Sequence, residues 1–283
     1  MDRRRFLALG AGTIGLWPLL RSGAAIAGGT AQSYGSGKLD LYPIAGQSGE
    51  AGAPILIYVH GGAWKAGSKS SVGAMPQYFN SLGTAFVSVG YSLGANVGQQ
   101  ASQIGEAVAW VERNAAQFGG DPARIALMGH SAGCHLSCLA VLSGQAPAVR
   151  ALIANDTAAY DLAFLADINN GRLPLLYASP FRDRSKWPQW SPISHAAGGN
   201  AIPVLVAWSG GRNRQKISQR FATALEAGGH KVVRFDGSAY NHISISRAVG
   251  KPKDPLNQVV TQFLEESLTI VEPGAEPALV PAQ

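Results

Sequence analysis

The chain has 283 residues, 46% of them hydrophobic and 14% charged, which is enough for one large domain with a substantial core. No run of 18 or more apolar residues occurs, so no membrane-spanning helix is expected. The formal net charge is +6, but Arg3, Arg4, Arg5 and Arg21 against Asp2 place +3 of it in the first 27 residues. No cluster of basic residues interleaved with aromatic residues follows, which argues against nucleic-acid binding.

The N-terminus has the pattern of an export signal. The three arginines are followed by Phe6, Leu7 and an apolar, glycine-rich stretch, and Ala25-Ile26-Ala27 then offers a small-x-small cleavage site. Paired arginines followed by x-Phe-Leu resemble a twin-arginine signal. We therefore expect residues 1–27 to be removed and the protein to be periplasmic or secreted, with no stable membrane anchor.

The remaining chain alternates predicted strands with predicted helices. An alternating edge strand and then short apolar runs, typical of strands buried on both faces, predict strands at 38–42, 54–59, 84–89, 124–128, 149–154, 203–208 and 231–235. Helical spacing predicts helices at 101–118, 131–142, 218–227 and 254–267.

This order predicts one α/β domain over 28–271, with a mostly parallel sheet covered by helices on both faces. The segment 161–192 interrupts the alternation and is either a cap over the active site or a structural insertion. A Pro/Ala-rich tail at 272–283 should be loose.

A predicted strand, a Gly-x-Ser-x-Gly motif and a predicted helix follow one another at Gly129-His130-Ser131-Ala132-Gly133. This is the setting of a nucleophile elbow, a turn so sharp that its flanking positions need small residues. The turn lifts the Ser131 hydroxyl clear of the sheet and points the N–H of Ala132 at a substrate carbonyl. Ser131 is therefore the candidate nucleophile.

A second glycine-rich segment, His60-Gly61-Gly62-Ala63-Trp64, comes directly after the strand predicted at 54–59. Glycines let the backbone turn its N–H groups towards a developing oxyanion. Gly61, Gly62 and Ala132 are the candidate oxyanion donors, whereas the side chain of His60 is expected to be structural.

A histidine base should follow the last strand of such a fold. Of the six histidines, only His242 lies in a loop just beyond the strand predicted at 231–235, and the order serine before histidine fits. Cys134 and Cys138 lie four apart on one predicted helix, which fits disulfide geometry poorly. No Cys/His set has zinc-ligand spacing, and we expect neither a metal nor an organic cofactor.

These motifs together resemble the esterase/arylformamidase (kynurenine formamidase-like) group of α/β hydrolases. The resemblance runs from about Leu39 to Leu264. It includes the segments 60–69, 89–93, 103–110 and 119–133, with Tyr160-Asp161-Leu162 and Ser191-Pro192. It implies the α/β-hydrolase fold and a serine hydrolase that acts through an acyl-enzyme.

The chain departs from this group at the acid of the triad. The group carries Asp or Glu after the strand predicted at 203–208, whereas this chain has Asn213 there. An Asn orients the histidine but adds no charge to stabilise its imidazolium form. We expect Asn213 to face His242; a different carboxylate (Asp236, Asp161 or Asp156) or a weakened site are the alternatives.

The sequence thus predicts a serine carboxylic-ester hydrolase (EC 3.1.1) acting on a small ester substrate. Two alternatives remain: an aryl formamide or amide hydrolase of the same fold, and an exported binding protein with a degraded triad. Export argues against a cytosolic kynurenine substrate, and Asn213 is the feature that favours the binding protein.

Overall fold

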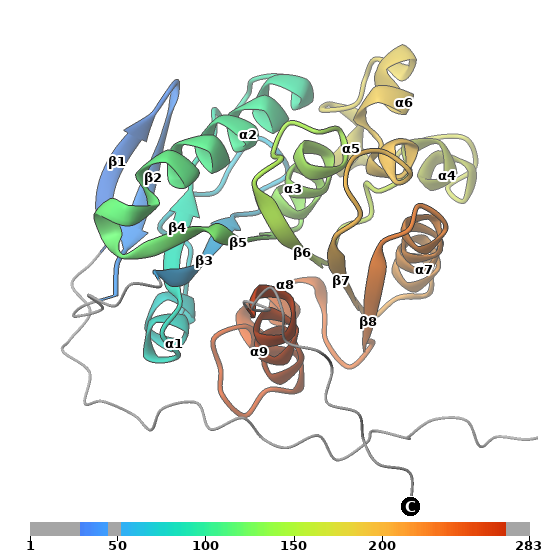
Figure 1. The fold of residues 1–283 in the computed structure, drawn as a ribbon. Helices are drawn as coiled ribbons and strands as arrows, with labels where there is room; N and C mark the ends of the chain where they lie inside the picture. Colours follow the sequence, from blue (N-terminus) through green and yellow to red (C-terminus); the bar gives the residue numbers. More distant parts are fainter. Residues whose placement is uncertain (1–28, 45–51, 270–283) are drawn as a thin grey trace, which may run out of the picture.

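The structure of the protein, a computed structural model, describes residues 29–44 and 52–269. The predicted signal at 1–27 and the predicted tail at 272–283 lie outside these ranges. The centre is an eight-stranded sheet in the order β1-β2-β4-β3-β5-β6-β7-β8 (Figure 1).

The first two strands differ from the rest of the sheet in direction. β1 pairs antiparallel with β2, and β2 antiparallel with β4, whereas every later pair is parallel. The eight strands are β1 (Thr30–Tyr34), β2 (Gly37–Tyr42), β3 (Ala53–Val59), β4 (Ala85–Val89), β5 (Gly120–His130), β6 (Val149–Asn155), β7 (Pro203–Ser209) and β8 (Lys231–Gly237). All predicted strands are present, and β1 was not predicted.

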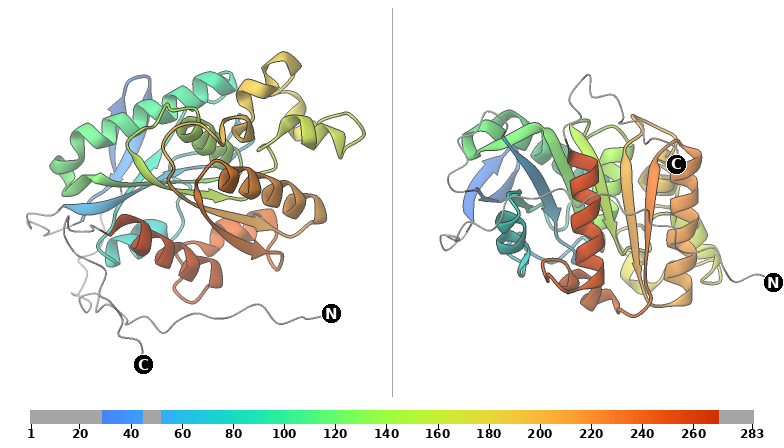
Figure 2. Two further views of the ribbon diagram at one scale, coloured as in Figure 1. Left: turned by 45° about the vertical axis from the view of Figure 1, so that its right-hand side comes forward. Right: turned by 60° about the horizontal axis from the view of Figure 1, so that its bottom comes forward.

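Helices connect the parallel strands and cover both faces of the sheet (Figures 1 and 2). The long helices are α2 (Val97–Asn114), α3 (Ala132–Leu142), α7 (Arg212–Ala227) and α9 (Pro255–Leu268). The shorter ones are α1 (Met75–Ser81), η1 (Ala115–Phe118), α4 (Leu162–Asp167), α5 (Leu175–Ala178), η2 (Arg184–Lys186), α6 (Trp187–Trp190), η3 (Pro192–His195) and α8 (His242–Ala248). Among the described residues, no helix is long and apolar enough to cross a membrane.

Two separate cores hold the helices to the sheet. Along β3, Ile55, Ile57 and Val59 point to the core shared with α2, α3 and α7, whereas Leu56 and Tyr58 point to the core shared with α1, α8 and α9. This alternation is the consequence of a side-chain period of two in a strand. The predicted mostly parallel sheet with helices on both faces is confirmed.

The segment 161–192 folds into short helices between β6 and β7. Its aromatic residues Tyr177, Phe181 and Trp187 are buried. Figure 2 shows this segment near α2 and α7, on the opposite side of the sheet from α9. Tyr177 and Phe181 pack against Trp64, with ring centroids 5.6 and 4.8 Å from its own, so the segment touches the residues that follow β3.

Candidate active site

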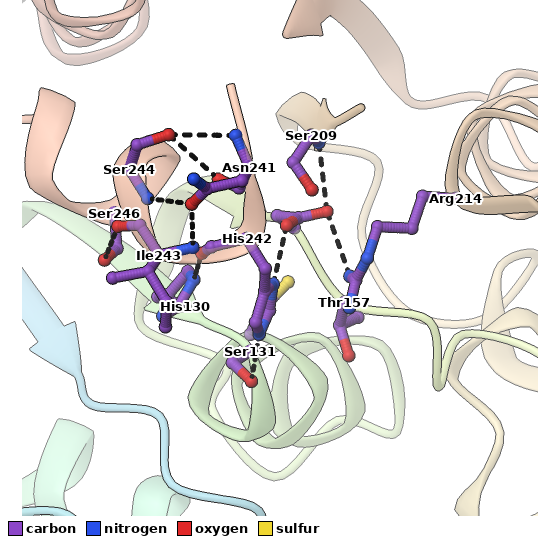
Figure 3. Close-up of polar contacts among 12 residues, drawn as sticks. His130, Ser131, Thr157, Ser209, Arg214, Asn241, His242, Ile243, Ser244 and Ser246 are labelled. Atoms are coloured by element: carbon purple, nitrogen blue, oxygen red, sulfur yellow. Dashed lines mark hydrogen bonds and ion pairs between the residues drawn. The ribbon is translucent and has the colours of Figure 1, made fainter. Parts of the chain in front are cut away.

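The turn between β5 and α3 presents Ser131 (Figure 3). Its backbone has φ 57° and ψ −120°, a left-handed region that costs free energy for a residue with a side chain. A Cβ at Gly129 would lie 2.3 Å from the carbonyl oxygen of Gly133, and a Cβ at Gly133 would lie 2.2 Å from that of Val59. Strand, turn and helix therefore pack so closely that only glycine fits at these two positions.

The Ser131 hydroxyl points to His242. Ser131 is the N-cap residue of α3, yet its side chain does not cap the helix. Its Oγ lies instead 2.9 Å from Nε2 of His242, the first residue of α8. Asn241 caps α8 by accepting the N–H groups of Ile243 and Ser244, which fixes the start of the helix and with it the position of the imidazole.

The other imidazole nitrogen is held by Asp156, not by Asn213. Nδ1 of His242 lies 2.7 Å from Oδ2 of Asp156, the first residue after β6. Asn213 lies exposed in the first turn of α7. The expectation that Asn213 occupies the acid position is therefore wrong, and the third alternative, Asp156, is the residue in that place.

The strand arrangement explains how an acid after β6 can replace one after β7. β6 and β7 are neighbours in the sheet and parallel, so their carboxyl ends lie side by side. The N–H of Asp156 donates to the carbonyl of Ala207 in β7, and Oδ1 of Asp156 accepts the N–H of Ser209 at the end of β7. Asp156 has φ 60°, a left-handed conformation that Asp tolerates better than most residues.

The surroundings of Asp156 keep its carboxylate ionised. Its side chain is fully buried, and burial by itself would raise its pKa. The hydrogen bond from His242, the Arg214 guanidinium at 3.1 Å and the Ser209 N–H outweigh burial and lower the pKa of Asp156 to about 2. A buried carboxylate with these three partners is a stable negative charge at the back of the imidazole.

The other two carboxylates that the sequence offered have different partners. Asp236 accepts the indole N–H of Trp208 at 3.1 Å and the N–H of Ser238 at 3.0 Å. Asp161 caps α4 and pairs with Arg220 at 3.0 Å. Both therefore act in local structure, and the expectation that Asp236 could hold His242 is wrong as well.

The glycine-rich segment after β3 lies against Ser131. A Cβ at Gly61 would come within 2.9 Å of the Ser131 Cβ, and one at Gly62, whose φ is 131°, would come within 2.0 Å of the Ala66 carbonyl oxygen. Within the described part of the chain, no backbone acceptor receives the Gly62 N–H. The N–H of Ala132 belongs to the first residue of α3, so the positive end of the helix dipole faces the same space.

A buried network fixes the two residues after these glycines. Ala63 and Trp64 both have positive φ, 53° and 63°, which is unfavourable for two successive non-glycine residues. The Trp64 indole N–H donates to Nδ1 of His135 at 3.2 Å, and Nε2 of His135 donates to the carbonyl of Trp190 at 2.7 Å. Burial lowers the pKa of His135 to about 4, so the ring is neutral and can serve both partners.

His130, the residue directly before Ser131, supports the backbone of His242. Its Nε2 lies 2.9 Å from the His242 carbonyl, and the two rings pack with centroids 4.7 Å apart. Burial, together with the nearby His242 ring, lowers the pKa of His130 to about 4. No pattern in the sequence predicts these contacts or the His135 network, since both depend on segments far apart in the chain.

His130, Asp156 and His242 are also the group whose ligand atoms could hold a metal ion, since these atoms lie within 4.8 Å of one another. Both nitrogens of His242 and Nε2 of His130 already take part in hydrogen bonds. The hydrogen bonds that link Ser131, His242 and Asp156 explain why these side chains lie close together. Cys134 and Cys138 are buried free thiols, as their spacing predicted.

Comparisons with known proteins agree with this architecture. The BD-FAE family model matches residues 39–166. Kynurenine formamidase from Danio rerio is 30% identical over 218 residues, which cover 74% of this chain and 71% of that protein. Esterase LipQ from Mycobacterium tuberculosis is 34% identical over 234 residues, which cover 75% of this chain and 55% of LipQ. The matched region thus spans little more than half of LipQ's length.

Solved structures show the same fold. An arylesterase structure superposes with a TM-score of 0.70 at 18% identity, covering 87% of each chain. EstE1, a carboxylesterase cloned from a metagenomic library, superposes with a TM-score of 0.69 at 23% identity, covering 87% of this chain and 90% of its own. At these identities the likeness concerns the fold alone.

Proposed function

Because the chain belongs to the esterase and arylformamidase family of α/β hydrolases, we propose that it hydrolyses carboxylic esters through an acyl-enzyme formed on Ser131. One observation carries the proposal: two hydrogen bonds of 2.9 and 2.7 Å link Ser131 to His242 and His242 to Asp156. This is the geometry that activates a serine hydroxyl.

Each group has one role in the proposed reaction. The Oγ of Ser131 attacks the ester carbonyl while Nε2 of His242 takes the hydroxyl proton. Asp156 keeps the Nδ1 proton in place and stabilises the imidazolium that forms. The N–H groups of Gly61, Gly62 and Ala132 stabilise the oxyanion, and His242 returns the proton to the departing alcohol.

Deacylation uses the same groups in reverse order. A water molecule gives a proton to Nε2 of His242 and attacks the acyl carbonyl of the Ser131 ester. The tetrahedral intermediate collapses, His242 returns the proton to the Ser131 oxygen, and the carboxylic acid leaves.

A fluorophosphonate probe and short p-nitrophenyl esters test this proposal on the purified protein. We expect the probe to label Ser131, and Ser131→Ala to abolish both labelling and turnover with a loss of several orders of magnitude. Ser137→Ala is the matched control, since Ser137 lies on the same helix and its hydroxyl has no hydrogen-bond partner among the described residues. Labelling that survives Ser131→Ala would contradict the proposal.

Aryl formamide hydrolysis is the second candidate, because a kynurenine formamidase is among the relatives. The same triad and oxyanion donors would serve, since an amide and an ester share the attacked carbonyl. Comparing kcat/KM for p-nitrophenyl acetate and for N-formylaniline separates the two. A higher kcat/KM for the formamide would make aryl formamide hydrolysis the first candidate and ester hydrolysis the second. The binding-protein alternative loses its main support, because it rested on Asn213 as the acid.

We further propose that the protein leaves the cytoplasm through the twin-arginine route, on the strength of the paired arginines and the Ala25-Ile26-Ala27 site. Arg3→Lys with Arg4→Lys should leave the precursor in the cytoplasm. N-terminal sequencing of the exported form should read from near Gly28. Unchanged export of the double variant would argue against this route.

A further inference from the structure

The exposed large apolar side chains of the described residues all follow the carboxyl ends of parallel strands, namely β4, β6 and β8, and these ends share one edge of the sheet. The side chains are Leu93, Leu175, Leu176 and Ile243, which are 44%, 94%, 53% and 53% exposed. A single exposed leucine is ordinary on a protein surface, but a group confined to one face indicates an interaction site. This face is the one that also carries Ser131.

Local contacts place each of the four beside the site. Ile243 follows His242 directly, and the residue after Leu93 donates its N–H to the carbonyl of Trp64. α5, which carries Leu175 and Leu176, is joined to the segment after β3 by the packing of Tyr177 on Trp64. A hydrogen bond of 2.7 Å from Lys65 to Ser179 adds a second link.

The leucine pair lies within a cationic stretch. Between residues 172 and 186 the chain carries four exposed cations and one exposed acidic residue, Asp183, a net charge of +3. The cations are Arg172, Arg182, Arg184 and Lys186. Arg172 precedes α5 and the other three cations follow it, so the cations flank Leu175 and Leu176 in the chain. Exposed leucines flanked by cations are the pattern of a protein surface that adsorbs to anionic lipid.

We infer that the face formed by Leu93, α5, η2 and Ile243 docks reversibly on an anionic lipid bilayer, with Ser131 on the side turned to the lipid. In this arrangement, which rests on the proposed ester hydrolysis, the substrates are acyl esters carried in or on the bilayer. The leucines enter the interface, and Arg182, Arg184 and Lys186 meet the headgroup phosphates. Adsorption of this kind is reversible and differs from a membrane anchor.

Vesicle co-sedimentation of the Ser131→Ala protein measures docking without hydrolysis of the lipid. Vesicles of phosphatidylcholine alone are compared with vesicles of three parts phosphatidylcholine to one part phosphatidylglycerol, at low and high salt. We expect binding to the anionic vesicles that weakens with salt. Leu175→Ser with Leu176→Ser should weaken the partition by about tenfold or more.

A matched pair of charge variants tests the orientation. Arg182→Gln with Lys186→Gln should weaken binding to the anionic vesicles by about tenfold or more, because each cation near an anionic surface contributes to adsorption. Arg150→Gln with Lys231→Gln should not, because these two exposed cations lie on β6 and β8 at the opposite edge of the sheet. All variants share the same N-terminal residues, so any contribution from that segment cancels.

Three results would overturn the docking surface: equal binding to both vesicle types, no effect of the leucine changes, or equal losses for the two charge pairs. Turnover of soluble p-nitrophenyl acetate by the protein with an intact Ser131 is measured alongside, and the leucine changes should leave it unaltered. If the protein binds vesicles but does not turn over the ester, the proposed hydrolysis is wrong and the docking surface stands. The two proposals therefore fail separately.

Discussion

Asp156→Asn removes the negative charge behind His242 with almost no change in volume. In the structure the carboxylate accepts the Nδ1 proton at 2.7 Å and is itself held by Arg214 and Ser209. An asparagine in this place can offer its NH₂ to Nδ1, which favours the tautomer with the proton on Nε2. That tautomer cannot take the proton of Ser131, and the charge that stabilises the imidazolium is gone as well.

The size of the effect follows from the charge and the tautomer together. Two unit charges about 4 Å apart at an effective dielectric constant of about 20 attract by about 4 kcal/mol. At about 1.4 kcal/mol per tenfold, that energy corresponds to a rate factor of about a thousand. The unfavourable tautomer adds to it, and the same substitution in a serine protease lowers kcat about 10,000-fold. We therefore expect a loss of about 1,000- to 10,000-fold.

The assay is kcat/KM on p-nitrophenyl acetate, with circular dichroism and thermal unfolding to show that the fold is kept. Asp161→Asn is the matched control, since Asp161 is also an ion-paired aspartate close to β6, and asparagine can still cap α4. Asn213→Asp should change the rate by no more than about twofold, because Asn213 does not hold His242. An Asp156→Asn protein that folds and retains a tenth of the activity would refute the assignment.

Three further predictions test the packing around the site. Lowering the pH from about 6.5 to 4 should lower the free energy of unfolding by about 3 kcal/mol for each of His130 and His135. Burial lowers their pKa in the folded state to about 4, so the unfolded chain takes up these protons at a higher pH than the folded chain does. Equal urea midpoints at both pH values would contradict this. Gly62→Ala should lower kcat about 100-fold, because its Cβ would clash with Ala66 and displace the Gly62 N–H from the oxyanion. Gly73→Ala is the control, since Gly73 also has a positive φ but lies in open space, and it should leave kcat unchanged. Equal kcat values for the two variants would remove Gly62 from the proposed oxyanion donors. His135→Phe should lower the free energy of unfolding by about 1–3 kcal/mol, since it leaves the Trp64 N–H buried and unpaired, and an unchanged Tm would count against the network.

The sequence located the parts of the site that depend on local motifs. Ser131 and the glycines before Trp64 each follow a buried apolar run directly, and such a run with its turn can be read without knowledge of the fold. His242 was found by its place after the last strand, although it begins α8 and does not lie in a loop.

The acid could not be located in this way, because its choice depends on two neighbouring strands. The ends of β6 and β7 lie side by side, and a carboxylate after either strand can reach the same imidazole nitrogen. Family resemblance favoured β7 and therefore Asn213. The available signal was Asp156 itself, a charged residue directly after a strand whose last five residues are buried, since a charge in such a place is costly unless it is paired.

The contact between Gly133 and Val59 joins the two halves of the proposed active site. The helix that follows Ser131 and the strand that leads to Gly61 and Gly62 touch backbone to backbone, with no side chain between them to rearrange. Ser131 and Gly61 therefore move as one rigid body that is already assembled before substrate arrives. Heating should consequently inactivate the protein at the temperature where the sheet itself melts, without an earlier transition confined to the active site.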